Sequence, residues 1–234
     1  MDIIAGIYFD EDLVWFENNG SQSFTKRTID GSLGGSANSV SAVDLDGDND
    51  LDIVCGTYSS SILFWFENDG SQSFTRYTIS SGLTASPVAI DLDEDGDLDL
   101  VGRVNDGSER IVWWENNGSE SFTLNQIDNS KGGLLSVADL DEDGDYDIIA
   151  TDVTNGHVNW YANNGSESFT KSTIDNSGMT SAYQVEVGDV DGDGDLDVVA
   201  QTASGNNTAD DKIVWYANDG SESFTEYDVD TDLN

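Results

Sequence analysis

Internal repetition constrains the fold of this chain more than any other feature of its sequence. The motif Asn-(Asn/Asp)-Gly-Ser-(Gln/Glu)-Ser-Phe-Thr occurs five times, starting at Asn18, Asn68, Asn116, Asn163 and Asn218. Each copy follows an apolar run that contains a tryptophan, and the matching tryptophans are 50, 48, 47 and 55 residues apart. A period near 50 residues predicts a modular fold in which each unit packs against its neighbours.

Each repeat has the pattern of four short strands. One apolar run precedes an aspartate-rich segment, a second follows it directly, and the tryptophan run and the run after the Asn-Gly pair supply two more. The tryptophan run is apolar on both faces, as at Leu13-Val14-Trp15-Phe16, so its sheet needs cover on both sides. Antiparallel four-stranded units stacked face to face form a β-propeller, whereas a solenoid would need parallel strands and shorter repeats.

We therefore expect an all-β chain that forms a single β-propeller domain over residues 1–234. The expected repeats cover residues of about 1–35, 36–84, 85–132, 133–180 and 181–234. Five blades of four antiparallel strands are expected, with one blade lacking a strand, because Asp2-Ile3-Ile4-Ala5 matches the residues that follow an aspartate segment elsewhere. Two alternatives stay open: the chain is part of a longer one, or it self-associates through the incomplete blade.

Four nine-residue segments carry aspartate at positions 1, 3, 5, 7 and 9. These aspartates are Asp44, Asp46, Asp48, Asp50 and Asp52; Asp91, Asp93, Asp95, Asp97 and Asp99; Asp139, Asp141, Asp143, Asp145 and Asp147; and Asp189, Asp191, Asp193, Asp195 and Asp197. Ca²⁺ takes six to eight hard oxygen ligands, and carboxylates at positions 1, 3 and 5 of a tight loop converge on one point. Position 7 would add a backbone carbonyl and position 9 a closing carboxylate. The segments thus predict four Ca²⁺ sites.

The sixth position of each segment must turn sharply. It is occupied by Gly96, Gly144 and Gly194, and in the first segment by Asn49, which tolerates left-handed backbone geometry best after glycine. An EF-hand starts in a similar way but needs a glutamate at position 12 and flanking helices. A solvated acidic turn is the alternative, yet five aspartates so close together repel one another unless a cation is present.

The remaining composition narrows the partners. Asp and Glu number 47 against 8 Lys and Arg, which gives a formal net charge of −39 and argues against binding to nucleic acid or insertion into membranes. Cys55 is the single cysteine and is expected in the core. His157 is the single histidine, and no nucleophile, base and acid recur together, so we do not expect an enzyme. A polysaccharide-active enzyme is the less favoured alternative.

The aspartate segments resemble those of the integrin-alpha-like FG-GAP/VCBS repeats. The family motif Asp-x-Asp-Gly-Asp-Gly-Asp-x-Asp is matched in full by residues 189–197, and the resemblance covers essentially the whole chain. It implies a β-propeller with Ca²⁺ held between the first two strands of each blade. It also implies an extracellular or cell-surface protein that binds carbohydrate or protein ligands in adhesion. The alternative is a structural segment of a larger adhesin, or an amplified or designed repeat scaffold, with no ligand site.

The segments that differ among the repeats are the candidates for ligand binding. They follow the second strand of each repeat and are expected as loops, because binding residues commonly occupy variable loops on a rigid scaffold. Tyr8, Phe9, Tyr58 and Arg103 are the candidate ligand-binding residues in them. The repeated tryptophans, in contrast, are expected to form core between blades.

Overall fold

The computed structural model describes residues 2–58, 60–82, 87–105, 109–119, 121–129, 132–176, 182–202 and 212–230. Two compact units are distinguished by their internal contacts. The first comprises Met1–Asp91 and Gly96–Asn129, and the second comprises Leu92–Asp95 and Ser130–Asn234. Every regular element in the described residues is a β-strand, as the sequence predicted. The same residues contain no helix that is long and apolar enough to cross a membrane.

The first unit contains three antiparallel sheets. The three-stranded sheet comprises β1 (Ile3–Ile7), β2 (Asp12–Asn18) and β3 (Phe24–Asp30). The next sheet comprises β4 (Ala37–Val43), β5 (Asp52–Thr57), β6 (Ile62–Asn68) and β7 (Phe74–Ser81). The third comprises β8 (Val88–Ile90), β9 (Asp99–Asn105), β10 (Glu109–Asn116) and β11 (Phe122–Asp128).

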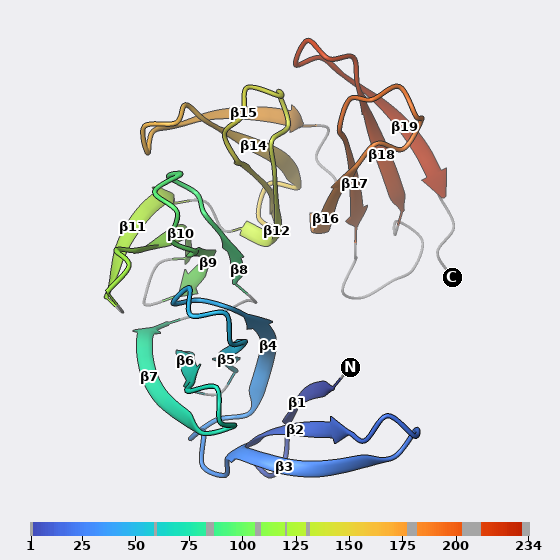
Figure 1. The fold of residues 1–234 in the computed structure, drawn as a ribbon. Helices are drawn as coiled ribbons and strands as arrows, with labels where there is room; N and C mark the ends of the chain where they lie inside the picture. The colour runs from blue at the N-terminus through green and yellow to red at the C-terminus, as the bar shows by residue number, and fades with distance from the viewer. Residues whose placement is uncertain are drawn as a thin grey trace. The chain divides into compact units, whose positions relative to one another are not determined.

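The second unit contains two antiparallel sheets. One comprises β12 (Gly132–Ala138), β13 (Asp147–Asp152), β14 (His157–Asn163) and β15 (Phe169–Asp175). The other comprises β16 (Ala182–Gly188), β17 (Asp197–Thr202), β18 (Ile213–Asn218) and β19 (Phe224–Asp230). In all five sheets, neighbours in sequence are neighbours in the sheet (Figure 1). Five sheets, of which one has three strands, confirm the predicted fold class, whereas the extent of the domain stays a prediction.

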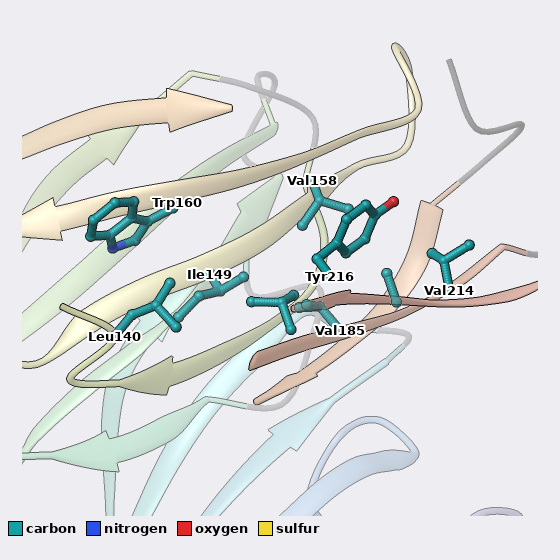
Figure 2. Packing of buried hydrophobic residues seen from close by; sticks show 9 residues of the cluster. Leu140, Ile149, Val158, Trp160, Val185, Val214 and Tyr216 are labelled. Atoms are coloured by element: carbon teal, nitrogen blue, oxygen red, sulfur yellow. The ribbon is translucent and has the colours of Figure 1, made fainter. Parts of the chain in front are cut away.

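Apolar side chains from adjacent sheets form the core within each unit. In the second unit, Trp160 and Val158 of β14 pack with Tyr216 of β18 and with Leu140 from the β12–β13 loop (Figure 2). In the first unit, Trp65 is 1% exposed and lies in the corresponding cluster. The clusters confirm the expected core role for Trp65 and Trp160, and Trp113 is also buried, whereas Trp15 and Trp215 are only half-buried. Cys55 is fully buried, also as expected.

The hairpin turn that follows the tryptophan strand of each sheet is longer than the two-residue Asn-Gly turn that the sequence suggested; in the first sheet it lies between β2 and β3. In the first sheet, Gly20 and Gln22 both have left-handed backbone angles, with φ of 79° and 62°, and the amide of Asn19 donates to the carbonyl of Ser23 at 3.0 Å. The backbone of Asn19 is not left-handed. Its side-chain oxygen Oδ1 instead accepts a hydrogen bond from the amide of Ser21 at 2.8 Å. The Asn side chain thus closes the turn, because it can mimic a backbone turn.

Candidate metal centres

The four aspartate segments occupy the same place in four sheets. Each connects the first strand to the second, with its ninth residue beginning the second strand: β4 to β5, β8 to β9, β12 to β13 and β16 to β17. The three-stranded sheet has no first strand in the described residues, and Asp2 directly precedes β1. The segments are therefore strand–loop–strand connections, as the sequence predicted.

In three loops the aspartate at position 1 accepts a hydrogen bond from the backbone amide of position 6, whereas Asp189 in the fourth loop accepts from the amide of Gly192 at 2.7 Å. Asp139 Oδ2 accepts from the amide of Gly144 at 3.1 Å, and Asp44 Oδ2 accepts from the amide of Asn49 at 3.0 Å. The sixth residue is left-handed in every loop: φ is 73° at Asn49 and 103° at Gly144. The prediction that asparagine replaces glycine at this turn is confirmed.

The residue at position 4 of each loop also has a left-handed backbone conformation, which was not predicted from the sequence. Gly47 and Gly192 have φ of 77° and 82°, but Glu94 and Glu142 adopt φ of 61° and 59°. A left-handed glutamate is uncommon, because its Cβ crowds the backbone. Glycine at the matching position of the other two loops was the available signal.

Position 9 ties the loop to the hairpin of the same sheet. Asp147 Oδ2 accepts from the amide of Leu140 at 3.1 Å, and its Oδ1 accepts from the amide of Asn163 at 2.8 Å. Asp52 and Asp197 make the same pair of bonds, and all four ninth-position aspartates are fully buried. Each oxygen keeps a further lone pair, because a carboxylate oxygen accepts more than one bond.

Burial makes two of these carboxylates, those of Asp52 and Asp147, reluctant to ionise. Desolvation raises the pKa of Asp147 from 3.8 to about 6, although the two backbone amides oppose the shift. Desolvation likewise raises the pKa of Asp52. At position 3, burial and neighbouring aspartates raise the pKa of Asp141. The loops thus concentrate negative charge that a cation would neutralise.

The structure brings together three carboxylates in each loop. Their oxygens lie within 4.8 Å of one another, and the groups are Asp44, Asp46 and Asp48; Asp91, Asp93 and Asp99; Asp139, Asp141 and Asp147; and Asp189, Asp191 and Asp197. Positions 1 and 3 belong to every group, joined by position 9 in three loops and by position 5 in the first. These groups could hold metal ions.

Position 7 belongs to none of these groups. Its carboxylate lies instead against the hairpin glycine of the same sheet: Asp145 at Gly165 and Asp195 at Gly220, with Asp50 and Asp97 placed alike. A Cβ added to Gly165 would lie 2.7 Å from Asp145 Oδ2. The side chain of position 7 therefore faces the hairpin, and only its backbone carbonyl remains for the ligand role expected of it.

One oxygen at position 1 supports the fit of a hard cation. Oδ1 of Asp44, Asp91 and Asp139 is buried and has no hydrogen-bond partner. A buried carboxylate oxygen without a partner is costly, and it is usually explained by an ion or a water. The donor atoms of the groups are all carboxylate oxygens, which suit Ca²⁺ better than softer metals. The residues present thus fit the cation that the family implies.

In two loops the second residue, Leu45 or Leu140, joins one sheet to the next, a contact that the sequence did not predict. Leu45 and Leu140 are 3% and 2% exposed. The carbonyl of Leu45 accepts from Asn116 Nδ2 at 3.2 Å, and that of Leu140 accepts from Asn218 Nδ2 at 3.3 Å. A third such bond of 3.1 Å runs from Asn163 to the carbonyl of Leu92, within the second unit. The repeated Asn that opens the hairpin motif was the available signal.

The ligand-binding candidates lie in different surroundings. Tyr8 and Phe9 lie between β1 and β2, with their ring centroids 5.3 Å apart, and Tyr58 directly follows β5. Ser36 links these two loops, because its hydroxyl donates to the carbonyl of Tyr8 at 2.7 Å and its carbonyl accepts from the amide of Tyr58 at 2.8 Å. Arg103 was expected in a loop but lies half-buried in β9, since that strand extends to Asn105.

Comparisons with known proteins agree with this architecture. The FG-GAP-like repeat matches at residues 1–55, 44–102, 91–150 and 139–200. A search of curated proteins found no match.

Three solved structures share the fold. One is an Agrocybe aegerita lectin described as recognising non-reducing terminal N-acetylglucosamine, with a TM-score of 0.63 and 18% identity over 100% of this chain and 67% of the lectin. The V. cholerae biofilm matrix protein Bap1 has a TM-score of 0.56 and 17% identity over 97% of this chain and 38% of its own. A mutant of AofleA from Arthrobotrys oligospora has a TM-score of 0.53 and 14% identity over 97% of this chain and 72% of its own. The five sheets are the blades of a β-propeller.

Proposed function

The chain belongs to the FG-GAP-like repeat family, and from this premise we propose that its aspartate loops bind Ca²⁺ and that it serves as a non-enzymatic, extracellular binding module. The observation that carries the calcium proposal is the convergence of carboxylate oxygens within 4.8 Å, together with the buried and unpartnered Oδ1 at position 1 of three loops. Bound Ca²⁺ would supply the positive charge that these loops lack.

The residues that would hold each ion are those of the four carboxylate groups. In the β12–β13 loop they are Asp139, Asp141 and Asp147, of which Asp147 also fixes the loop to the hairpin through its two backbone bonds. An ion bound there would hold Asp147 ionised and would tie the first strand, the second strand and the hairpin of the blade together. Calcium is thus proposed as a structural component and not as a switch.

The proposed ligand is a glycan, bound by the aromatic side chains of the loops after the second strands. Tyr8, Phe9 and Tyr58 are 56%, 92% and 66% exposed, and the hydrogen bonds of the Ser36 hydroxyl and carbonyl hold their two loops together. Aromatic rings offer a broad apolar face at small entropic cost, and exposed aromatic groups of this kind mark interaction sites. The similarity in fold to a lectin supports a sugar as ligand. A protein ligand is the alternative that the same surface would serve.

A glycan array in calcium-containing buffer tests the proposal. We expect reproducible binding to a set of sugars, and we expect Phe9→Ala and Tyr58→Ala to reduce it at least tenfold without lowering the melting temperature, because both side chains are exposed. Tyr227→Ala is the matched control, since Tyr227 is an aromatic residue of β19 with 49% exposure and lies in the other unit.

Two results would contradict the proposal. A folded, calcium-saturated chain that binds no sugar would exclude the glycan, and sugar binding unchanged by both aromatic substitutions would exclude this site. Release of reducing ends from a bound polysaccharide would contradict the non-enzymatic role.

A further inference from the structure

Three of the five hairpins carry a short sequence that the proposed calcium and ligand roles leave unused. Asn-Gly-Ser, which fits the Asn-x-Ser acceptor sequence for N-linked glycosylation, occurs at Asn19, Asn117 and Asn164. The second and fifth hairpins have aspartate in place of this asparagine, at Asp69 and Asp219. An acceptor sequence also arises by chance, so the surroundings of these asparagines decide whether they can carry a glycan.

The hairpin turn forms equally well with aspartate and with asparagine. Oδ1 of Asn19 accepts a hydrogen bond from the amide of Ser21 at 2.8 Å. In the second hairpin, Oδ1 of Asp69 accepts from the amide of Ser71 at 2.9 Å. The turn therefore needs only a side-chain oxygen at this position, and the amide nitrogen of asparagine takes no part in closing it.

The acceptor asparagines have exposed side chains with unused amide nitrogens. Asn19, Asn117 and Asn164 are all exposed, and within the described residues their Nδ2 atoms make no hydrogen bond. The asparagines that precede the last two differ, because Asn116 and Asn163 are buried and their Nδ2 atoms each donate to two carbonyls. Of each Asn-Asn pair, the residue that fits the acceptor sequence is thus the one whose nitrogen is free.

The space at the tips of the hairpins differs among the three sites. A Cβ added to Gly20 would meet no atom within 4 Å, so the residue after Asn19 lies in open space. Gly118 and Gly165 instead lie against aspartates of the neighbouring loops, although the serines that follow them are exposed. A glycan is bulky and needs a surface position. We therefore expect Asn19 to be the most completely modified of the three.

The hairpin of the first sheet lies far from its aromatic loop. β2 follows the loop of Tyr8 and Phe9 and ends at Asn18, directly before Asn19. It has 7 residues, and at about 3.3 Å per residue it separates the two ends by roughly 20 Å. A glycan attached to Asn19 would therefore leave the aromatic side chains free.

We propose that Asn19, Asn117 and Asn164 are sites of N-linked glycosylation, an inference that rests on the proposed extracellular role. The donor is an oligosaccharide linked through pyrophosphate to a polyprenyl lipid, and a transferase of the secretory pathway acts on it. Nδ2 bonds to the anomeric carbon of the sugar and loses a proton. The bond from that carbon to the pyrophosphate oxygen breaks, and the pyrophosphate leaves with the electron pair.

Secretion of the full chain from cultured animal cells, behind a cleavable leader, tests the proposal. Peptide N-glycosidase releases each glycan and converts its asparagine to aspartate, so digestion in heavy-oxygen water labels every modified site for mass spectrometry. We expect the label at Asn19, Asn117 and Asn164. A further acceptor sequence at Asn206 lies outside the described residues and is resolved as a separate peptide. The chain should stay folded after release, because Asp69 already occupies this position in the second hairpin.

Three substitutions provide matched controls. Ser21→Ala should remove the glycan from Asn19, whereas Ser21→Thr should retain it, because the acceptor sequence requires a hydroxyl residue at this place. Asp69→Asn completes an acceptor sequence in the second hairpin and should add a glycan there, since Asp69 is exposed and its turn has the same geometry.

Three results would overturn the proposal. The first is a secreted chain with a cooperative melting curve in which all three asparagines are unmodified. The second is a glycan at Asn19 that persists in Ser21→Ala. The third is a glycan found only on chains that lack a cooperative melting transition, which would show that the folded hairpins cannot carry it. None of these results touches the proposed ligand role, because the glycan array tests that role on chain produced without glycans.

Discussion

Replacing Leu140 by alanine tests the role of the second loop residue most sharply. The side chain is 2% exposed and packs in the cluster of Trp160 and Phe224, two rigid rings that cannot collapse into the space it leaves. Buried Leu→Ala substitutions cost about 2.7–5.0 kcal/mol, and the cost grows with the cavity that remains. The backbone carbonyl stays in place, so the bond from Asn218 is retained and the loss is one of packing alone. We expect a loss of about 3 kcal/mol in the free energy of unfolding, or roughly 6–12 °C in melting temperature for a chain of this size.

Urea unfolding followed by tryptophan fluorescence measures this loss. Leu51→Ala is the matched control, since Leu51 belongs to another aspartate loop but is 60% exposed, and it should change the free energy by less than about 0.5 kcal/mol. If Leu140→Ala were no more destabilising than Leu51→Ala, the second loop residue would not join the blades.

Two further predictions concern the loop aspartates. Gly165→Ala should destabilise the chain by about 0.5–1.5 kcal/mol more than Gly20→Ala, because both glycines are left-handed, with φ of 65° and 79°, but only the Cβ at Gly165 would push Asp145 off its rotamer. Equal melting temperatures of the two variants would show that Asp145 does not lie against the hairpin. Since the pKa of Asp147 is raised to about 6 in the fold, its contribution to stability is fully present below its unfolded pKa of 3.8 and is lost as pH rises through about 6. In excess chelator, acidification from pH 7.5 to 5 should therefore raise the melting temperature more than it does in saturating calcium, because bound calcium would hold Asp147 ionised. Thermal scans in both buffers measure the shifts. Equal shifts would argue against a calcium site at Asp147.

The fold could be predicted from the sequence because the repeat carries its own redundancy. Any one apolar run is ambiguous, but five aligned copies placed the tryptophans, the hairpins and the aspartate loops in register. The incomplete first blade followed from matching Asp2-Ile3-Ile4-Ala5 to Asp147–Ala150. The left-handed turn at Asn49 followed from its place among three glycines and is confirmed.

The contacts between blades could not be predicted in the same way. The pattern gives the loop leucine and the hairpin asparagine of each repeat, but Leu140 and Asn218 are 78 residues apart and belong to different repeats. Likewise, all five aspartates of a loop look equivalent in the sequence. Only the backbone path shows that Asp147 faces inward with both oxygens bonded, while Asp145 faces the hairpin glycine. Arg103 was misplaced because the length of β9 depends on its pairing with β10 and not on local composition.

The central claim is that the aspartate loops are calcium sites that hold the blades together. Equilibrium dialysis at calcium concentrations of about 0.1–10 mM measures it directly, since affinities on the order of 10⁻⁴–10⁻³ M are typical of extracellular modules. The account predicts four bound ions per chain, three after Asp139→Ala and Asp141→Ala are combined, and a melting temperature that falls when a chelator removes them. A chain that binds no calcium across this range, or whose melting curve is the same in excess chelator, would contradict it.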